Sequence, residues 1–332
     1  MTTLKDVAKL AHVDVSTVSR ALNNTSYVHP DTKARILAAV KELSYQPNVL
    51  VRGLRHGKRN TIGVVVPKLT FSIFAEVTFG IEEEARKRGY YTLLCNTLDD
   101  PNTEKQCLNR LRNGFVDGII IAATGTNTRL LRDIRVSGLP VTQIIRQHDA
   151  KMSSVVVDYV EIGYKAASYL VEKGCQKIAL VNGAMQIPPY QDRYKGYLKA
   201  IHQYGLNPIT VEKTAVLRGM HYGYDCTNLL IDRGETLDAV LVATDSQGMG
   251  ALRALKENDL KAPDDIRVLS MTGYRVGPML ETTLTSMELP GIEIGRQAAD
   301  ITIRAIEADA DHAVDPQQLL LSASLAVRES TG

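Results

Sequence analysis

The chain has 332 residues, 44% of them hydrophobic, and a formal net charge of +2, which allows more than one domain and a large buried core. It contains no apolar stretch long enough to cross a membrane and no segment that resembles a secretion signal, so a cytoplasmic protein is expected. The cysteines are widely separated and form no CxxC pair, which disfavours a disulfide framework and a metal site. They are Cys95, Cys107, Cys175 and Cys226.

The segment LKDVAKLAHVDVSTVSRALN, residues 4–23, predicts two short amphipathic helices joined by a tight turn. Thr3 is placed to cap the first helix and Asp14 the second. The residues expected to pack inward are Val7, Ala8, Leu10, Ala11, Val18, Ala21 and Leu22. The residues left facing outward, fully or in part, are Val15, Ser16, Thr17, Ser19, Arg20 and Asn23. Such a face can read base edges in a DNA major groove, although a small helical bundle with a solvated second helix would show the same pattern.

A third helix is predicted over residues 31–44, with Ile36, Leu37, Val40 and Leu43 on one apolar stripe. Charge is distributed unevenly along the chain. Residues 1–60 carry a net charge of +6, while the remaining residues carry −4. A basic headpiece on a mildly acidic body fits contacts to DNA phosphates made by the headpiece alone, which favours DNA binding over a merely solvated bundle.

The segment after the third helix, YQPNVLVRGLR at residues 45–55, is short, apolar and basic together. It is compatible with a plain linker. It is also compatible with a segment that folds only on DNA, with Leu54 as an apolar wedge between base pairs.

Residues 4–57 resemble the headpiece and hinge of the lactose-repressor (LacI/GalR) family of bacterial regulators. The resemblance rests on LKDVAKLAHVDVSTVSRALN, on VKELSYQPN and on the position of Leu54. It implies that Val15, Ser16 and Arg20 read bases, that Leu54 enters the minor groove, and that a homodimer binds a two-fold operator. The candidate DNA-binding residues are Thr3, Val15, Ser16, Thr17, Ser19, Arg20, Asn23 and Leu54.

In the remaining residues, continuous apolar runs alternate with helical stretches, which predicts an α/β fold with parallel sheets covered on both faces. The predicted strands include 61–67, 91–95, 118–122, 141–145, 154–158, 178–181, 239–243 and 268–271. The predicted helices include 73–88, 160–173, 191–204 and 246–258. The patterns RGYYTLL and KGCQKIAL, and likewise VDGIII and LDAVLV, repeat at similar places. Two doubly wound subdomains with a ligand cleft at the carboxyl ends of their strands are therefore expected.

The resemblance covers nearly the whole chain and implies a two-lobed periplasmic-binding-protein-like core. The expected organisation is a helix-turn-helix headpiece over 1–46, a hinge over 47–60 and a core over 61–332. The first lobe would comprise about 61–157 and 289–320, and the second about 158–288 and 321–332. The chain would cross between the lobes near Asp158, Glu288 and Leu321.

Charged residues at the ends of predicted elements are candidates for binding a small-molecule effector. Lys68, Arg146 and Asp245 follow strands, and Arg193 opens a helix. Each is also compatible with an ordinary surface charge, but the resemblance places Arg193 and Asp245 where family members bind effectors. The full candidate set is Lys68, Phe74, Arg146, Arg193, Asp245, Thr272 and Glu288.

Three cations with a single firm carboxylate suit a phosphate or carboxylate better than a neutral sugar. Sugar-sensing members usually carry an aspartate after the strand that corresponds to 268–271, where this chain has Thr272. The effector region resembles that of the trehalose-operon repressors, which sense trehalose 6-phosphate, with basic residues at the positions of Lys68, Arg146 and Arg193. A sugar acid such as gluconate, a neutral sugar and another sugar phosphate remain alternatives.

The predicted function is a repressor of carbohydrate-metabolism genes that its effector releases from DNA. The alternative is a corepressor, which would strengthen DNA binding. A sugar-binding protein without a regulatory role is the alternative class, but it would not need residues 1–57. No catalytic set, cofactor motif or metal motif is recognised in the sequence, so an enzyme is not expected.

The wedge assignment generates the first prediction. Leu54→Ala should weaken operator binding and reduce DNA bending while leaving the core folded, because an apolar wedge unstacks bases and supplies no charge. Gel phasing of operator fragments measures the bend. A bend equal to that of the wild type would contradict the wedge.

Overall fold

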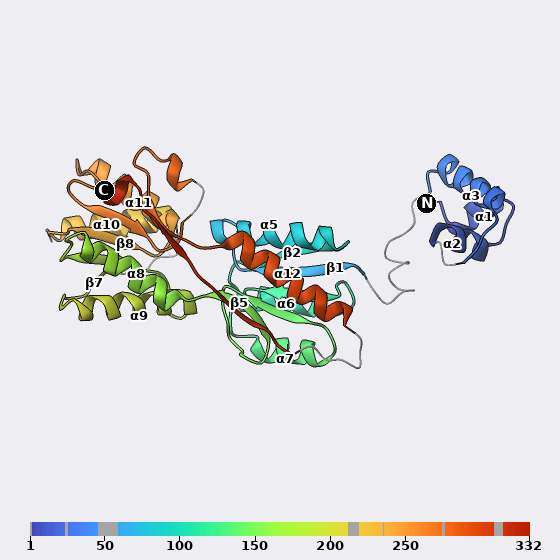
Figure 1. Ribbon diagram of the computed structural model, residues 1–332, viewed down its shortest axis with the longest axis horizontal. Helices are drawn as coiled ribbons and strands as arrows, with labels where there is room; N and C mark the ends of the chain where they lie inside the picture. Colours follow the sequence, from blue (N-terminus) through green and yellow to red (C-terminus); the bar gives the residue numbers. More distant parts are fainter. Residues whose placement is uncertain are drawn as a thin grey trace. The chain divides into compact units, whose positions relative to one another are not determined.

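The computed structural model describes residues 2–23, 26–45, 59–211, 219–234, 236–273, 276–308 and 315–332. The chain forms two compact units, residues 1–59 and residues 60–332 (Figure 1). No helix in the described ranges combines the length and the apolar character needed to cross a bilayer. Leu54 lies outside the described residues.

The headpiece is built from α1 (Leu4–Leu10), α2 (Val15–Asn23) and α3 (Pro30–Glu42). Val7, Val18 and Ile36, one from each helix, are fully buried at its centre. Two sequence expectations are wrong here, since the side chains of Leu10 and Leu37 are 38% and 50% exposed. Both residues lie on the flank of their helix's buried stripe, because each residue turns the helix by about 100°.

The first helix begins at a capping box. The Thr3 hydroxyl accepts from the Asp6 backbone nitrogen at 3.4 Å, and the Thr3 backbone nitrogen donates to Asp6 Oδ2 at 2.8 Å. The hydrogen bonds from Thr3 hold the pKa of the Asp6 carboxyl below its usual value. The predicted cap is therefore confirmed.

The first sheet of the core has the strand order β11-β5-β4-β3-β1-β2, and its described pairings are parallel. Its strands are β1 (Thr61–Val66), β2 (Tyr91–Asn96), β3 (Gly118–Ile121), β4 (Val141–Ile144), β5 (Ser153–Val157) and β11 (Gln318–Leu321). The helices in this lobe are α5 (Ser72–Lys87), α6 (Pro101–Leu111), α7 (Thr128–Val136) and α12 (Gly291–Glu307). Every residue of β3 and β4 is buried, as in a parallel sheet covered on both faces.

The second sheet has the order β12-β10-β9-β8-β6-β7, in which only the described pair β10 and β12 is antiparallel. Its strands are β6 (Ile178–Val181), β7 (Ile209–Val211), β8 (Ala239–Val242), β9 (Arg267–Ser270), β10 (Thr285–Glu288) and β12 (Ser324–Ala326). Its helices are α8 (Tyr159–Glu172), α9 (Pro188–Gln203), α10 (Met220–Asp232) and α11 (Asp245–Glu257), with the 3₁₀ turns η1 (Gly277–Met279) and η2 (Glu329–Thr331).

The predicted fold class is confirmed, with a helical headpiece and two doubly wound sheets in a two-lobed core. The eight predicted strands correspond to β1–β6, β8 and β9. Four strands that are short or partly exposed were not predicted, namely β7, β10, β11 and β12. The helices α6, α7, α10 and α12 were not predicted either.

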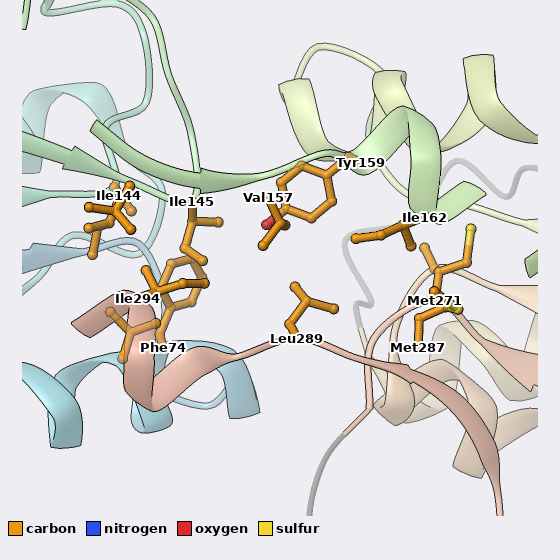
Figure 2. Packing of buried hydrophobic residues seen from close by; sticks show 14 of the residues in the cluster. Phe74, Ile144, Ile145, Val157, Tyr159, Ile162, Met271, Met287, Leu289 and Ile294 are labelled. Carbon is orange, nitrogen blue, oxygen red and sulfur yellow. The ribbon is translucent and has the colours of Figure 1, made fainter. Parts of the chain in front are cut away.

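The chain passes between the two lobes three times, between β5 and α8, between β10 and α12, and between β11 and β12. A buried apolar cluster continues across these connections (Figure 2). Val157 and Tyr159 belong to it on one connection and Leu289 on another, while Phe74 and Met271 represent the two lobes. The connections are therefore packed parts of the core and hold the two sheets end to end.

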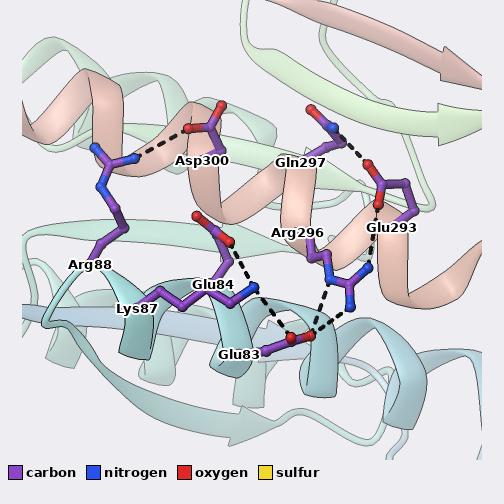
Figure 3. Close-up of polar contacts among 8 residues, drawn as sticks. All are labelled: Glu83, Glu84, Lys87, Arg88, Glu293, Arg296, Gln297 and Asp300. Atoms are coloured by element: carbon purple, nitrogen blue, oxygen red, sulfur yellow. Dashed lines mark hydrogen bonds and ion pairs between the residues drawn. The ribbon is translucent and has the colours of Figure 1, made fainter.

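In the first lobe, α5 and α12 pack at very short range through glycines. A Cβ at Gly80 would lie 2.1 Å from the Ile292 carbonyl oxygen, and one at Gly295 would lie 2.2 Å from the Val77 carbonyl oxygen. Ion pairs line the edge of this contact (Figure 3), including Arg296 with Glu83 at 2.8 Å. Such exposed pairs contribute little stability, so backbone packing holds these helices together.

Candidate nucleic-acid interface and effector cleft

The outward face of α2 carries the residues predicted to contact DNA. Val15, Ser16 and Arg20 are exposed, while Thr17, Ser19 and Asn23 are half-buried. Buried Val18 and Ala21 hold the opposite face against the headpiece core.

Local hydrogen bonds orient two of these side chains. The Arg20 guanidinium donates to the Ser16 hydroxyl at 3.3 Å, one helical turn away. The Asn23 amide donates to the Ser19 carbonyl oxygen at 2.9 Å. Thr3 is exposed, but its hydroxyl donates to Asp6 at 2.7 Å. Thr3 therefore has a structural role as a cap, and its contact with DNA stays a prediction.

A cleft opens between the two lobes, at the carboxyl ends of their strands, where a doubly wound fold binds its ligands. Its empty space, open solvent included, is about 520 Å³. The first lobe supplies Phe71, Ser72, Ile73, Phe74, Ile145 and Arg146. The second lobe supplies Tyr159, Ile187, Pro189, Tyr190, Arg193, Thr244, Asp245 and Thr272, and the connection to α12 supplies Leu289.

Arg193 is one of three charged residues in the described lining of the cleft, and all three are buried. It is 5% exposed, and its guanidinium lies 4.6 Å from the ring centroid of Tyr159 and 5.8 Å from that of Tyr190. Burial lowers the pKa of the Arg193 guanidinium, while the aromatic faces favour its positive charge. One amino group donates to Thr272 Oγ1 at 2.8 Å, whereas the buried Nε has no hydrogen-bond partner in the described part of the chain. An unsatisfied buried donor of this kind is unusual in a folded protein.

The prediction that Arg193 opens its helix is wrong, because α9 begins at Pro188 and Arg193 lies in its second turn. The backbone of α9 is held close to α8, which positions Arg193. A Cβ at Gly163 would lie 2.2 Å from the Arg193 carbonyl oxygen, and one at Gly196 would lie 2.0 Å from the Val160 carbonyl oxygen. Only glycine permits such an approach at these two positions. The aromatic surface and the arginine therefore reach the cleft from a rigid helix pair.

Asp245 is the acidic residue of the cleft lining and begins α11 after the Thr244 cap. Burial raises the pKa of its carboxyl, while a hydrogen bond from Ser72 opposes that shift. Ser72 Oγ donates to Asp245 Oδ2 at 3.0 Å. Because Ser72 belongs to α5 in the other lobe, this bond crosses the cleft.

Arg146 lines the cleft but already has a strong partner. Its two terminal nitrogens donate to the two carboxylate oxygens of Asp99 at 2.6 and 3.1 Å. The side chains are 6% and 13% exposed. Such bidentate pairs are among the strongest side-chain contacts.

The structure brings together five of the seven predicted effector residues, namely Phe74, Arg146, Arg193, Asp245 and Thr272. Lys68 and Glu288 are not among the described residues that line the cleft. The Lys68 ammonium lies 5.4 Å from the centroid of the Phe71 ring, and Glu288 forms an ion pair with Arg328.

Sequence reasoning did not identify Phe71, Ser72, Tyr159, Tyr190 and Leu289 as cleft residues. Tyr159 directly follows the predicted strand 154–158, so its place at a strand end was a usable signal. Within the described ranges, no group of three His, Cys, Asp or Glu side chains could hold a metal ion.

Comparison with known proteins matches both units. Residues 3–48 match the family described as bacterial regulatory proteins, lacI family. Residues 59–320 match the family described as periplasmic binding proteins and sugar binding domain of LacI family.

The relatives that match over nearly the whole chain include two repressors. The ribose operon repressor of Halalkalibacterium halodurans is 30% identical, with 100% of this chain and 97% of that protein covered. The HTH-type transcriptional repressor PurR of Haemophilus influenzae is 29% identical, with 99% and 98% covered. The fold resembles the lac repressor dimer bound to operator and the anti-inducer ONPF, with a TM-score of 0.86, 24% identity and 99% of each chain covered.

A helix-turn-helix headpiece joined to a two-lobed ligand-binding core defines a DNA-binding regulator. The chain belongs to the LacI family of bacterial regulatory proteins. This membership confirms the prediction that the chain is a transcriptional repressor and not an enzyme.

The exposed guanidinium on α2 generates the second prediction. Arg20→Ala should lose roughly 1–3 kcal/mol of discrimination between operator and random DNA, because arginine reads guanine edges by two hydrogen bonds. Competition binding at fixed salt measures this ratio. Arg35→Ala, an exposed charge change on α3, is the matched control and should leave the ratio within about twofold, since phosphate contacts act on all sequences alike. Unchanged discrimination by the Arg20 variant would remove its base-reading role.

Proposed function

We propose that this protein is a cytoplasmic repressor of carbohydrate-metabolism genes that a sugar releases from its operator. The observation that carries this proposal is the cleft, whose polar groups come from both lobes. A ligand that replaced the Ser72 hydroxyl at Asp245 would change the contact between the lobes. The alternative of a sugar-binding protein without a regulatory role leaves the headpiece without a use.

The charges of the cleft favour a neutral sugar as the effector. Asp99 forms an ion pair with Arg146, and the negative charge of Asp245 favours the charged form of Arg193. Lys68, the third cation of the phosphate hypothesis, is not part of the described lining. Aromatic faces at Phe71 and Tyr190 suit the apolar faces of a sugar ring, and Asp245 can accept its hydroxyls.

A phosphorylated sugar of the trehalose 6-phosphate type is the second candidate. It is favoured by the unpartnered Nε of buried Arg193, which could donate to a phosphate oxygen. A sugar acid such as gluconate would use the same donor.

The direction of the switch is proposed as induction. If the lobes are arranged differently in the DNA-bound and the effector-bound protein, the effector lowers the affinity for DNA. DNA then lowers the affinity for the effector by the same factor. A corepressor would strengthen operator binding instead. The names of the two relatives described above identify repressors but do not say which effect their effectors have on DNA binding.

We propose that the chain acts as a homodimer that places two headpieces on a two-fold operator. The edge strand β2 supports this, because Tyr91, Leu93 and Leu94 on it are 72%, 40% and 40% exposed. An exposed apolar edge strand is normally covered by a partner.

The dimer generates the third prediction. Sedimentation equilibrium should give about twice the chain mass of 36.5 kDa, and Leu93→Glu should shift the equilibrium toward the monomer, because it adds a charge to the edge strand. Val136→Glu, at a site 87% exposed on α7, is the control and should keep the wild-type mass. A monomer at micromolar wild-type concentration would refute the proposal.

The effector proposal generates the fourth prediction. Calorimetry should show that a neutral sugar binds at least as tightly as its phosphate, with trehalose, D-ribose, their phosphates and gluconate as the probes. Arg193→Ala should lower the affinity for the probe that binds by about one to two decades, because a charge-assisted hydrogen bond contributes roughly 1.5–3 kcal/mol.

Arg253→Ala, an exposed arginine on α11, serves as the control for this series and should bind as the wild type does. The sugar that binds should also release operator DNA. Tighter binding of a sugar phosphate or of gluconate would identify that class as the effector. If the sugar strengthened operator binding, it would be a corepressor and not an inducer.

A further inference from the structure

The contact between Asp99 and Arg146 has the geometry of a built pair and not of a chance surface contact. Both terminal nitrogens of Arg146 meet a separate oxygen of Asp99, at 2.6 and 3.1 Å, and both side chains are largely buried. Arg146 also donates to the Ala123 carbonyl oxygen at 3.4 Å. Its guanidinium is therefore held on the first-lobe wall of the cleft by the lobe itself.

The backbone at and next to Asp99 and Arg146 adopts left-handed conformations, which are unfavourable for residues other than glycine. Leu98 and Asp99 have φ values of 56° and 61°, and Ile145, next to Arg146, has 63°. Left-handed backbone is uncommon outside glycine and is an outlier for a β-branched residue such as isoleucine. Strained residues persist only where the surrounding structure over-determines them, and they cluster at functional sites. Here they lie on the two segments that present Asp99 and Arg146 to each other.

The pair determines the net charge that a ligand meets. Two arginines and one aspartate occur among the described residues that line the cleft. Asp99 lies outside that lining, yet its carboxylate satisfies Arg146 at both terminal nitrogens. An anionic ligand would have to compete with the Asp99 carboxylate for the Arg146 guanidinium, because both terminal nitrogens of Arg146 already donate to Asp99.

We propose that Asp99 is a specificity-determining residue that makes the cleft select an uncharged sugar, by neutralising Arg146. This inference rests on the proposed function for the identity of the site. Removing the carboxylate of Asp99 would leave Arg146 as a buried cation without a carboxylate partner, and the same cleft would then favour phosphate esters.

The test is calorimetry on Asp99→Asn, with inorganic phosphate and with the neutral and phosphorylated forms of trehalose and D-ribose. Asparagine tolerates the left-handed backbone at this position. The variant should bind phosphate probes at least about tenfold more tightly than the wild type, since one charge-assisted contact corresponds to that factor or more. Adding Arg146→Met to Asp99→Asn should abolish the gain, which separates charge release from a change in shape.

Asp149→Asn is the matched control. Asp149 accepts from Arg132 Nε at 2.5 Å in the same lobe, and neither residue is in the described lining of the cleft. Its substitution removes the same carboxylate charge and should give no gain in phosphate affinity. An equal gain in phosphate affinity in this control would overturn the inference, because the gain in Asp99→Asn would then reflect only the change in net charge.

Thermal melting identifies variants that fail to fold. If Asp99→Asn does not melt cooperatively, Asp99→Gly replaces it, since glycine accepts the positive φ without strain. Wild-type protein that binds a phosphorylated sugar more than tenfold better than the neutral sugar would overturn the inference without any variant.

The outcomes distinguish the two proposals. A wild-type chain that binds no sugar would overturn the proposed function, while a phosphate gain in Asp99→Asn that depends on Arg146 would still support the role of Asp99. Sugar binding by the wild type with no phosphate gain in the folded variant would overturn the role of Asp99 alone.

Discussion

The chain crosses three times between the two sheets of the core, and the rest of the core depends on how these three connections place the sheets. They hold the sheets end to end, so that loops after the strands of both lobes face one another. Buried side chains on the passages, including Val157, Tyr159 and Leu289, continue the apolar core between the lobes (Figure 2). A ligand in the cleft therefore contacts two bodies that are joined by packed connections, and its binding energy can act on their relative arrangement.

Burial then decides which charges the cleft can contain. A desolvated ion is costly unless it has partners, and the partners differ from one charge to the next. Arg146 has a carboxylate at both terminal nitrogens, whereas Arg193 has two aromatic faces and a threonine hydroxyl. The first arrangement satisfies the charge within the protein. The second leaves the Arg193 Nε without a hydrogen-bond partner among the described residues. The two arginines of the cleft are therefore stabilised in different ways.

The headpiece obeys a separate set of constraints. Its helices are short, and an isolated helix of this length is marginal in water. Its stability depends on a small core around Val7, Val18 and Ile36 and on the Thr3 cap. Because α2 packs on this core through its opposite face, the side chains of Val15, Ser16 and Arg20 are exposed, as their predicted contact with DNA requires.

The sequence by itself determined the features that depend on short-range periodicity. These are the three headpiece helices, the cap at Thr3, the alternation of buried strands with helices, and the location of Asp245 just after a strand. Only the tertiary structure decided which charges meet. Ser72 and Asp245 are 173 positions apart, and Asp99 and Arg146 are 47 apart. Helical and strand periods specify which face a residue occupies, but they contain no information on how loops from different strands bring two side chains within hydrogen-bond distance. The pairing of Arg146 with Asp99 is therefore a feature that the sequence did not predict.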